Sequence, residues 1–344
     1  MSNFKLTVLN PGGNDPDQYF PDYAGEVDSS VHAPTNFHAY AACTGGAFLR
    51  SVKNAISLNQ PVMLLISHHQ KRCYNALKKL KNAGLTVAVS LKETGSHQFA
   101  GEFVNIKSLS LLKQIITLAD GVIAPTEALV PVYRALRPKS TLESVRFIPM
   151  PCPVKDKRWN FSIPLEKREG IFLGTRELKT SSRNHIAALI ILSGYIKHHK
   201  VKLGLINKDG KLLWQIIKEL DIPKSLVEVQ IPLPYPDYLR YMSKHRIVVQ
   251  LDQSMVPGQV ANDTVLSRMI CVGGNGTIDQ MVFPEFCGRF HCRQDLLEKI
   301  HKLLNDDIYY KKSLAAAQEK AVELISYPRI AESLQEFFKS TLHI

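Results

Sequence analysis

The fold is decided by the stretch Arg246-Ile-Val-Val-Gln-Leu-Asp-Gln-Ser-Met-Val-Pro-Gly-Gln-Val-Ala-Asn-Asp263. Ile247 to Leu251 are short, β-branched and apolar on both faces, which predicts a buried β-strand. Pro257 and Gly258 then predict a loop, and the residues from about Gln259 to Met269 are able to form a helix. The stretch is therefore a strand–loop–helix unit.

The start of this helix suits an anion. The first backbone N–H groups of a helix have no partner within it, and Gly258 would let a phosphate approach the backbone closely. Asp263 lies five residues further on, roughly 7 Å along a helix axis, where it could accept hydrogen bonds from a sugar diol. These features suggest a nucleotide site. The alternative is an ordinary strand–loop–helix unit in which Asp263 is a surface acid.

Length and composition indicate a soluble protein of two domains. The chain has 344 residues, of which 45% are hydrophobic and 22% charged. No apolar run reaches the roughly 18 residues of a membrane span. The N-terminus enters a strand pattern at once, without the apolar core of a signal peptide. We therefore expect a cytoplasmic protein.

The cysteines and the net charge limit the redox state, the metal content and the class of binding partner that we expect. Six cysteines are scattered, so reduced thiols are expected rather than disulfides. His291 and Cys292 follow Cys287, but no second Cys or His pair has ligand spacing, and we expect no metal. The net charge of +12 fits anionic partners. These could be nucleotide phosphates, a phospholipid surface, a lipid diphosphate or nucleic acid.

Strand and helix patterns alternate in two blocks. The first block contains strand patterns at 6–9, 61–66, 86–91, 121–124 and 145–148, and helix patterns at 36–58, 69–83 and 107–118. The second contains strands at 170–173, 201–206, 227–231 and 247–251, and helices at 183–197, 212–220 and 235–244. The prolines of 149–153 predict a linker. Alternation of this kind predicts two doubly wound α/β domains, with ligands in the cleft between them.

The predicted helix over 69–83 is strongly basic. Tyr74, Leu77 and Leu80 form a narrow apolar face, and lysines and arginines cover the rest. Such a helix could lie on an anionic membrane at its inner face. It could equally pack on the sheet with solvated lysines outside.

Several segments, in order, resemble the GT-B retaining glycosyltransferases, in particular those similar to glycosyltransferase family 4. The similar segments are the stretch quoted above, Asp120-Gly-Val-Ile-Ala-Pro-Thr126, Arg146-Phe-Ile-Pro-Met-Pro-Cys-Pro-Val154 and Gly174-Thr-Arg-Glu-Leu-Lys179. The resemblance implies an N-terminal Rossmann-like acceptor domain (1–154), a C-terminal nucleotide-sugar domain (155–326) and a last helix (327–344) that crosses back to the first domain.

The chain departs from that family at several positions. The family motif has two glutamates separated by seven residues; here Met255 replaces the first, which contacts the transferred sugar, and Asp263 replaces the second, which binds the ribose. The usual histidine of the first domain is absent, and the corresponding strand ends in Ser90-Leu-Lys-Glu-Thr-Gly95, with His97 nearby. The donor segment carries an insertion of hydroxyls and bases at 180–185.

The resemblance assigns roles to particular residues. Transfer requires charge neutralisation at the leaving diphosphate. The expected cations are Arg176, Lys179 and Arg183, and the expected backbone donors are Gly258 and Gln259. Gly12 and Gly13 would let substrate approach the first domain. The candidate proton acceptors are Glu93 and His97, with His32, His38, His68 and His69 as further imidazoles.

The sequence therefore predicts a hexosyltransferase-like glycosyltransferase. It would transfer a sugar from a nucleotide-diphosphate sugar to an unidentified acceptor, a glycan, a lipid-linked molecule or a small molecule, with retention and without a metal or other cofactor. Two alternatives remain open. One is a phage-type DNA-base glycosyltransferase with a basic surface. The other is a degenerate GT-B protein that binds or scaffolds, which Met255 favours. Nucleotide, sugar and acceptor are not revealed.

Overall fold

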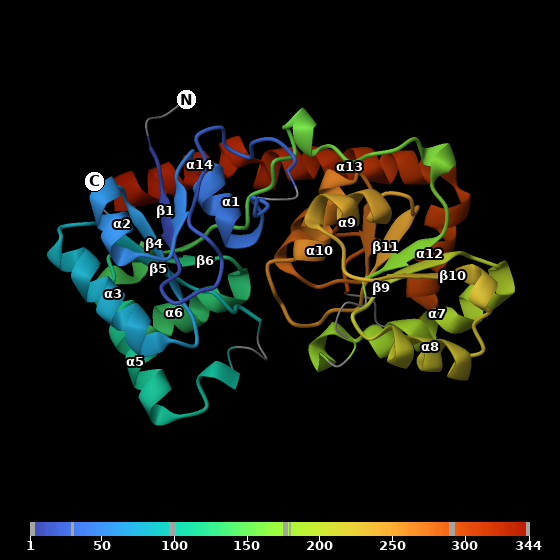
Figure 1. The fold of residues 1–344 in the computed structure, drawn as a ribbon, viewed down its shortest axis with the longest axis horizontal. Helices are drawn as coiled ribbons and strands as arrows, with labels where there is room; N and C mark the ends of the chain where they lie inside the picture. Colours follow the sequence, from blue (N-terminus) through green and yellow to red (C-terminus); the bar gives the residue numbers. More distant parts are fainter. Residues whose placement is uncertain are drawn as a thin grey trace. The chain divides into compact units, whose positions relative to one another are not determined.

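The chain forms two compact units, each with its own parallel sheet (Figure 1). The structure is a computed structural model that describes residues 4–28, 31–95, 99, 101–174, 178, 180–288 and 293–341. Unit 1 comprises residues 1–158 and 325–344, and unit 2 comprises residues 159–324. The sequence-based boundaries were 154/155 and 326/327.

Unit 1 contains a seven-stranded sheet in the order β2-β3-β1-β4-β5-β6-β7, in which only the pair β2–β3 is antiparallel among the described strands. The strands are β1 (Thr7–Leu9), β2 (Gln18–Tyr19), β3 (Ala47–Leu49), β4 (Val62–Ile66), β5 (Val87–Leu91), β6 (Gly121–Ala124) and β7 (Val145–Phe147). Every residue of β1, β3, β4, β5 and β6 is buried, as expected for a parallel sheet covered on both faces. The strand order reverses between β1 and β4, the position where doubly wound sheets bind ligands.

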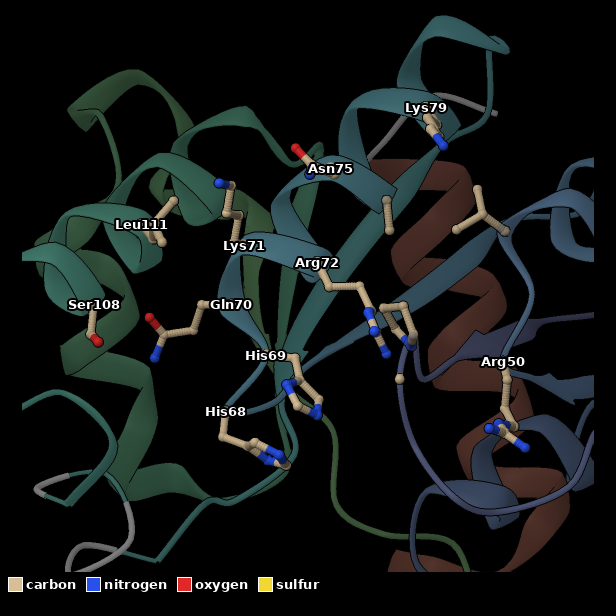
Figure 2. Close-up of a pocket in the computed structure, with 14 residues that line it drawn as sticks. Arg50, His68, His69, Gln70, Lys71, Arg72, Asn75, Lys79, Ser108 and Leu111 are labelled. Atoms are coloured by element: carbon tan, nitrogen blue, oxygen red, sulfur yellow. The ribbon is translucent and has the colours of Figure 1, made fainter.

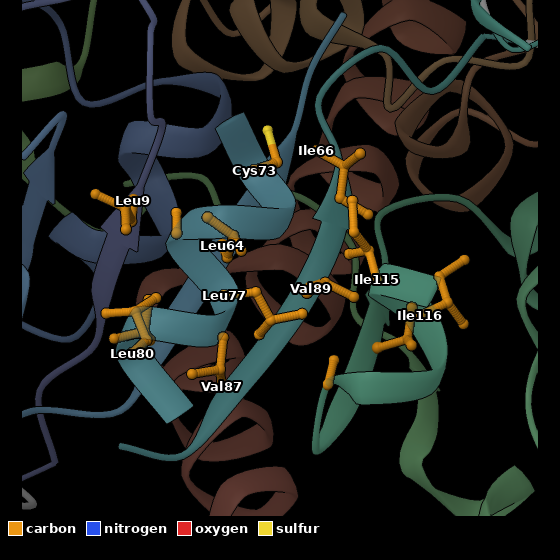
Figure 3. Close-up of a cluster of buried hydrophobic side chains, with 14 of the residues drawn as sticks. Leu9, Leu64, Ile66, Cys73, Leu77, Leu80, Val87, Val89, Ile115 and Ile116 are labelled. Atoms are coloured by element: carbon orange, nitrogen blue, oxygen red, sulfur yellow. The ribbon is translucent and has the colours of Figure 1, made fainter. Parts of the chain in front are cut away.

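One face of this sheet carries the main core of unit 1. The helices of unit 1 are α1 (Asn36–Ala42), α2 (Val52–Leu58), α3 (Gln70–Asn82), α5 (Ile106–Leu118), α6 (Val130–Leu136) and α14 (Tyr327–Glu336). Figure 3 shows Cys73, Leu77 and Leu80 of α3 turned toward the side chains of β4 and β5. Leu77 and Leu80 are fully buried. The apolar face of α3 is thus occupied by the protein core and is not available for insertion into lipid.

The single helix expected over 36–58 is wrong, because α1 and α2 are separated by β3. Gly45 adopts the left-handed conformation (φ +66°) just after α1. A Cβ on Gly46 would lie 2.0 Å from the carbonyl oxygen of Leu6. The two glycines therefore turn the chain tightly against β1, and residues 47–49 pair with β1 in parallel.

The C-terminal segment packs within unit 1. The backbone N–H of Cys152 donates to Ile325 O (2.8 Å), and that of Tyr327 donates to Cys152 O (3.2 Å). The hydroxyl of Tyr327 donates to the carbonyl of Pro34 (2.8 Å). The ring of Phe338, fully buried, lies 5.7 Å from that of Phe4. This segment therefore packs against three separate parts of unit 1, around Phe4, Pro34 and Cys152.

Unit 2 contains a five-stranded parallel sheet in the order β10-β9-β8-β11-β12. The strands are β8 (Ile171–Leu173), β9 (Leu203–Ile206), β10 (Val227–Gln230), β11 (Ile247–Val249) and β12 (Ile270–Val272). The helices are α7 (His185–His199), α8 (Gly210–Glu219), α9 (Tyr235–Met242), α10 (Gln259–Leu266), α11 (Thr277–Val282), α12 (Arg293–Asn305) and α13 (Asp307–Ile325). The order reverses between β8 and β11, as in a Rossmann fold. The predicted α/β class with two Rossmann-like sheets is confirmed.

Arg137 closes the C-terminal end of α5, and we expect its loss to destabilise unit 1. Its guanidinium donates to the carbonyls of Ile116 (2.6 Å), Ala119 (2.9 Å) and Asp120 (3.1 Å), and only 8% of the residue is exposed. Arg137→Leu leaves these acceptors without their charged donor, which should lower the free energy of unfolding by about 2–3 kcal/mol. Urea denaturation measures this change. Arg134→Leu, on the exposed side of α6, is the control and should change stability by less than about 0.5 kcal/mol; equal effects would contradict the prediction.

Candidate functional site

In unit 2 the loops that follow β8 and β11 are bound together. The side-chain amide of Asn184 donates to the carbonyl of Leu251 (2.8 Å), and the backbone N–H of Gln253 donates to the carbonyl of Ser182 (3.0 Å). The segment 180–185, which the sequence marked as an insertion, therefore packs on the loop that leads to Gly258. Both lie at the point where the strand order of unit 2 reverses.

Gly258 begins α10 in a conformation that few other residues adopt. Its φ is +98°, and a Cβ there would lie 3.2 Å from the backbone nitrogen of Ile278 and from Oδ2 of Asp279. It is the N-cap residue of α10 and offers no side chain to the first-turn N–H groups, which include that of Gln259. Those groups are free to bind an anion, as the sequence predicted for this position.

Asp279 lies under the glycine loops and holds them together. It is 2% exposed, and its Oδ1 accepts a hydrogen bond from the side chain of Gln250 (2.8 Å). A Cβ on Gly274 would lie 2.2 Å from this oxygen, and one on Gly276 would lie 2.8 Å from Oδ2. Burial raises the pKa of Asp279 to about 6, and hydrogen bonds from Gln250 and Cys271 partly offset this rise. No local pattern in the sequence pointed to this residue.

Asp263 is buried in a hydrogen-bond network of its own. It is 2% exposed, and its Oδ1 accepts from the hydroxyl of Tyr235 (2.6 Å) and from Nε2 of Gln259 (2.5 Å). Burial raises its pKa to about 6, against the lowering effect of hydrogen bonds from Tyr235, Gln259 and Tyr238. A ribose hydroxyl could reach this oxygen only after Tyr235 or Gln259 turns away.

Of the three cations predicted to bind the diphosphate, the structure describes Arg183, whereas Arg176 and Lys179 lie outside the described residues. Nε of Arg183 lies 3.7 Å from Oδ2 of Asp252, and the Arg183 side chain is 41% exposed. Asp252 is 5% exposed and also accepts from the backbone N–H of Ser254 (2.8 Å). Arg183 is thus held beside the loop before Gly258.

Met255 occupies the tip of that loop. It adopts a left-handed conformation (φ +54°), which is uncommon for a residue with a side chain, and 45% of it is exposed. Its correspondence to the first acid of the family motif stays a prediction. The thioether offers no strong hydrogen-bond acceptor for a sugar hydroxyl.

In unit 1 a polar cluster lies after β1 and β5. Oδ1 of Asp15 is 3.8 Å from Nε2 of His32, and its Oδ2 is 3.9 Å from Nζ of Lys92. The ring of His32 stacks on that of His38 at 3.9 Å. Burial first, and then the charges of His32 and Lys92, lower the pKa of His38 to about 2, so this imidazole stays neutral. Sequence reasoning named both histidines but missed Asp15 and Lys92.

The other residues predicted for unit 1 are partly described. Gly12 has φ +90° and lies against the side chains of His69 and Arg72. A Cβ on Gly13 would overlap the amide of Asn10, which is buried without a partner among the described residues. Glu93 is half-buried directly after Lys92, and His97 lies outside the described residues.

The described residues hold neither a metal-binding cluster nor a helix that could span a membrane. Those residues contain no group of three His, Cys, Asp or Glu side chains arranged to hold a metal ion. Every helix among them is too short or too polar to cross a membrane.

Comparison with known proteins gives structural likeness at low identity. No family model and no curated protein sequence matches the chain. TarM of S. aureus, solved with fondaparinux, alpha-GlcNAc-glycerol and UDP, has 15% identity and a TM-score of 0.60, and the match covers 89% of this chain. The chain spans only 59% of TarM.

Two other structures match over nearly their whole length. Sucrose-phosphate synthase from Thermosynechococcus elongatus has 14% identity and a TM-score of 0.63, with 98% of each chain covered. An alpha-glucosyltransferase in complex with UDP has 11% identity and a TM-score of 0.63, with 96% of this chain and 98% of that chain covered. The chain has the GT-B fold. Its assignment to family 4 and the Glu-x7-Glu motif stays a prediction.

The two buried acids of unit 2 predict an unusual dependence of stability on pH. The folded protein holds a proton on Asp263 up to about pH 6, whereas an unfolded aspartate loses it near pH 4. Folding is therefore favoured by this group below about pH 4, and the contribution is lost as pH rises through 6. Relative to the wild type, Asp263→Asn should gain about 2 kcal/mol in free energy of unfolding between pH 4 and pH 7.

Urea denaturation at both pH values tests this. Asp237→Asn, an exposed aspartate of α9 paired with Arg240, is the control. If Asp263→Asn and the control show the same change with pH, the carboxyl of Asp263 does not titrate as described.

Proposed function

We propose that this protein is a glycosyltransferase that transfers a sugar from a nucleotide-diphosphate sugar to an acceptor, with retention and without a metal. The observation that carries the proposal is the start of α10, where free backbone N–H groups can bind an anion. It lies at the carboxyl edge of unit 2, in a fold shared with proteins solved with UDP. Unit 2 would hold the donor, and unit 1 the acceptor.

Three groups of unit 2 would bind the donor diphosphate. The free N–H groups of the first turn of α10 supply fixed dipoles, and Gly258 leaves room for a phosphate near them. Arg183 supplies a charge that can exchange its contact with Asp252 for a phosphate oxygen. Preorganised donors of this kind stabilise the negative charge that develops on a leaving diphosphate. Arg176 and Lys179 remain predicted members of the set.

Asp263 would bind the ribose by exchanging partners. Its carboxylate already accepts hydrogen bonds from Tyr235 and Gln259, so a ribose hydroxyl would replace one of them. The displaced Tyr235 hydroxyl would remain close to the nucleoside. Such an exchange fits a site that orders around its ligand.

The best-placed proton acceptor of unit 1 is His32. Its Nδ1 lies 3.0 Å from the carbonyl oxygen of Ala33. A carbonyl only accepts hydrogen bonds, so Nδ1 carries the hydrogen and Nε2 has the free lone pair in the neutral ring. A proton taken up at Nε2 would face the carboxylate of Asp15, 3.8 Å away. Glu93 and His97 remain predictions.

Two other functions are kept as alternatives. The first is transfer to DNA bases; one similar alpha-glucosyltransferase was solved with UDP and a 13-mer DNA. The second is a binding or scaffolding protein without transfer, which Met255 favours. A protein of the second kind need not distinguish nucleoside diphosphates from one another, and it releases no sugar.

The donor site makes a direct prediction. A nucleoside diphosphate that binds only the folded protein raises its thermal midpoint by mass action. In a panel of UDP, GDP, ADP and the matching nucleotide sugars, we expect one base to stabilise most. Arg183→Gln should weaken that ligand about tenfold, the effect of losing one charged hydrogen bond. Arg240→Gln, an exposed arginine of the same unit, should bind normally. A panel in which no ligand raises the midpoint contradicts the proposal.

The acceptor side makes a separate prediction. Asp15→Asn keeps the shape of the side chain but removes the negative charge beside Nε2 of His32. Release of nucleoside diphosphate from the preferred nucleotide sugar should slow about a hundredfold, within the range of general base catalysis. The thermal shift with the nucleoside diphosphate should stay unchanged, because Asp15 lies in unit 1. A variant as fast as the wild type would remove His32 and Asp15 from the mechanism.

A further inference from the structure

Unit 1 contains a large cavity at the carboxyl edge of its sheet. Its volume is about 890 Å³, within the range of ligand pockets. Gly12 enters it from the loop after β1, Arg50 from the end of β3, and His68 and His69 from the end of β4. The strand order of unit 1 reverses between β1 and β4, so the cavity lies where doubly wound sheets bind ligands.

The lining of this cavity is cationic. Arg50, Lys71, Arg72 and Lys79 line it, and the described residues around it include no aspartate or glutamate. None of these four cations forms an ion pair within the described part of the chain. Figure 2 shows Arg72 extending from α3 toward Arg50, whereas Lys71 lies on the opposite side of the helix start, where Leu111 and Ser108 are.

The nearest acid does not neutralise this group. The carboxylate of Asp17 accepts hydrogen bonds from the backbone N–H of Arg50 (2.7 Å) and from the side chain of Asn54 (3.0 Å). The guanidinium of Arg50 is left to solvent. Other cations of unit 1 behave differently: Lys81 pairs with Asp120 at 2.5 Å.

The backbone adds to the positive potential. α3 has 13 residues and begins beside the cavity, with His69 as N-cap and no acid in its first turn. The partial positive charge of a helix start therefore adds to the charges of Lys71 and Arg72. Gly12 brings the loop after β1 so close that a Cβ there would lie 2.4 Å from Nη1 of Arg72.

We propose that this cavity binds the phosphate of a phosphorylated sugar or polyol, the acceptor of the reaction proposed above. Arg50 and Arg72 would hold the phosphate oxygens beside the start of α3. Lys79, in the last turn of that helix, would add positive charge further along the cavity. That the ligand is an acceptor rests on the proposed function. That the cavity binds a phosphate ester can be tested whether or not the protein transfers a sugar.

The cavity suits a small phosphate ester better than nucleic acid. Its cations line one space, Arg50 from the end of β3 and the other three from α3, whereas duplex binding usually spreads them along a face. No Phe, Tyr or Trp side chain lines it, and such rings are the usual platforms for unpaired bases. The volume leaves room for a sugar beside the phosphate.

Calorimetric titration of the full chain tests the proposal. The probes are inorganic phosphate, glucose 6-phosphate, fructose 6-phosphate, glycerol 3-phosphate and unphosphorylated glucose. We expect at least one phosphate ester to bind more tightly than inorganic phosphate, and glucose not to bind. Arg72→Gln and Arg50→Gln should each weaken the preferred ester about tenfold or more. Lys78→Gln is the matched control, since Lys78 is exposed on the same helix but does not line the cavity.

The outcomes separate this inference from the proposed function. Equal weakening by Arg72→Gln and Lys78→Gln, or no binding of any phosphate compound, overturns it. It is also overturned if inorganic phosphate binds as tightly as every ester, or if a 20-base-pair duplex competes for Arg50 and Arg72 more strongly than the esters do. The nucleoside diphosphate shift depends on unit 2, so it can persist when phosphate binding fails, and phosphate binding can persist when that shift is absent.

Discussion

Parallel pairing is the constraint from which both candidate sites follow. Parallel strands all point the same way, so the loops after neighbouring strands meet at one edge of the sheet. In unit 1 this edge gathers Gly12, Arg50 and His69 from β1, β3 and β4. In unit 2 it gathers the loops after β8, β11 and β12. Residues far apart in sequence thus become neighbours because of the geometry of the sheet, even where they do not contact each other.

In unit 2 the edge is shaped by buried carboxylates as much as by glycines. Asp279 fills the space that side chains at 274 and 276 would need, and Gly258 passes beside it. Burial raises the pKa of Asp279 more than its hydrogen bonds lower it, so the charged form is disfavoured there. Burial also raises the pKa of Asp263 on α10, which joins that helix to α9 through Tyr235. Both acids are therefore buried at some expense in stability, as in many functional sites.

The sequence was sufficient to predict most strands of the two sheets. It was not sufficient to predict contacts between residues far apart in the chain. Apolar β-branched runs such as 62–66 and 247–249 identified buried strands, because both faces of a parallel sheet are covered. β3 was missed because Phe48 and Leu49 also fit a helical period that continues into α2. What separates the two readings is the contact of Gly46 with Leu6, which lies 40 residues away in sequence.

The same limit applies to the sites. Gly258 and the start of α10 were predictable, because a glycine before a helix is a local signal. The partners of the acids were not: Tyr235 donates to Asp263 across 28 positions, and Gln250 to Asp279 across 29. The pairing of Asp15 with His32 and Lys92 likewise joins three separate loops. Periodicity contains no information on such pairs.

The placement of charge on α3 runs against the stability of the free protein. Acids stabilise the first turn of a helix and bases oppose its dipole, yet Lys71 and Arg72 stand there with no acid beside them. Arg50 faces the same cavity, so like charges are held together as well. Elsewhere in unit 1 the half-buried guanidinium of Arg158 forms ion pairs with Asp156 and Asp22. An anion in the cavity would relieve both the repulsion and the unfavourable dipole, and the energy released on binding would then be larger than the contacts alone provide.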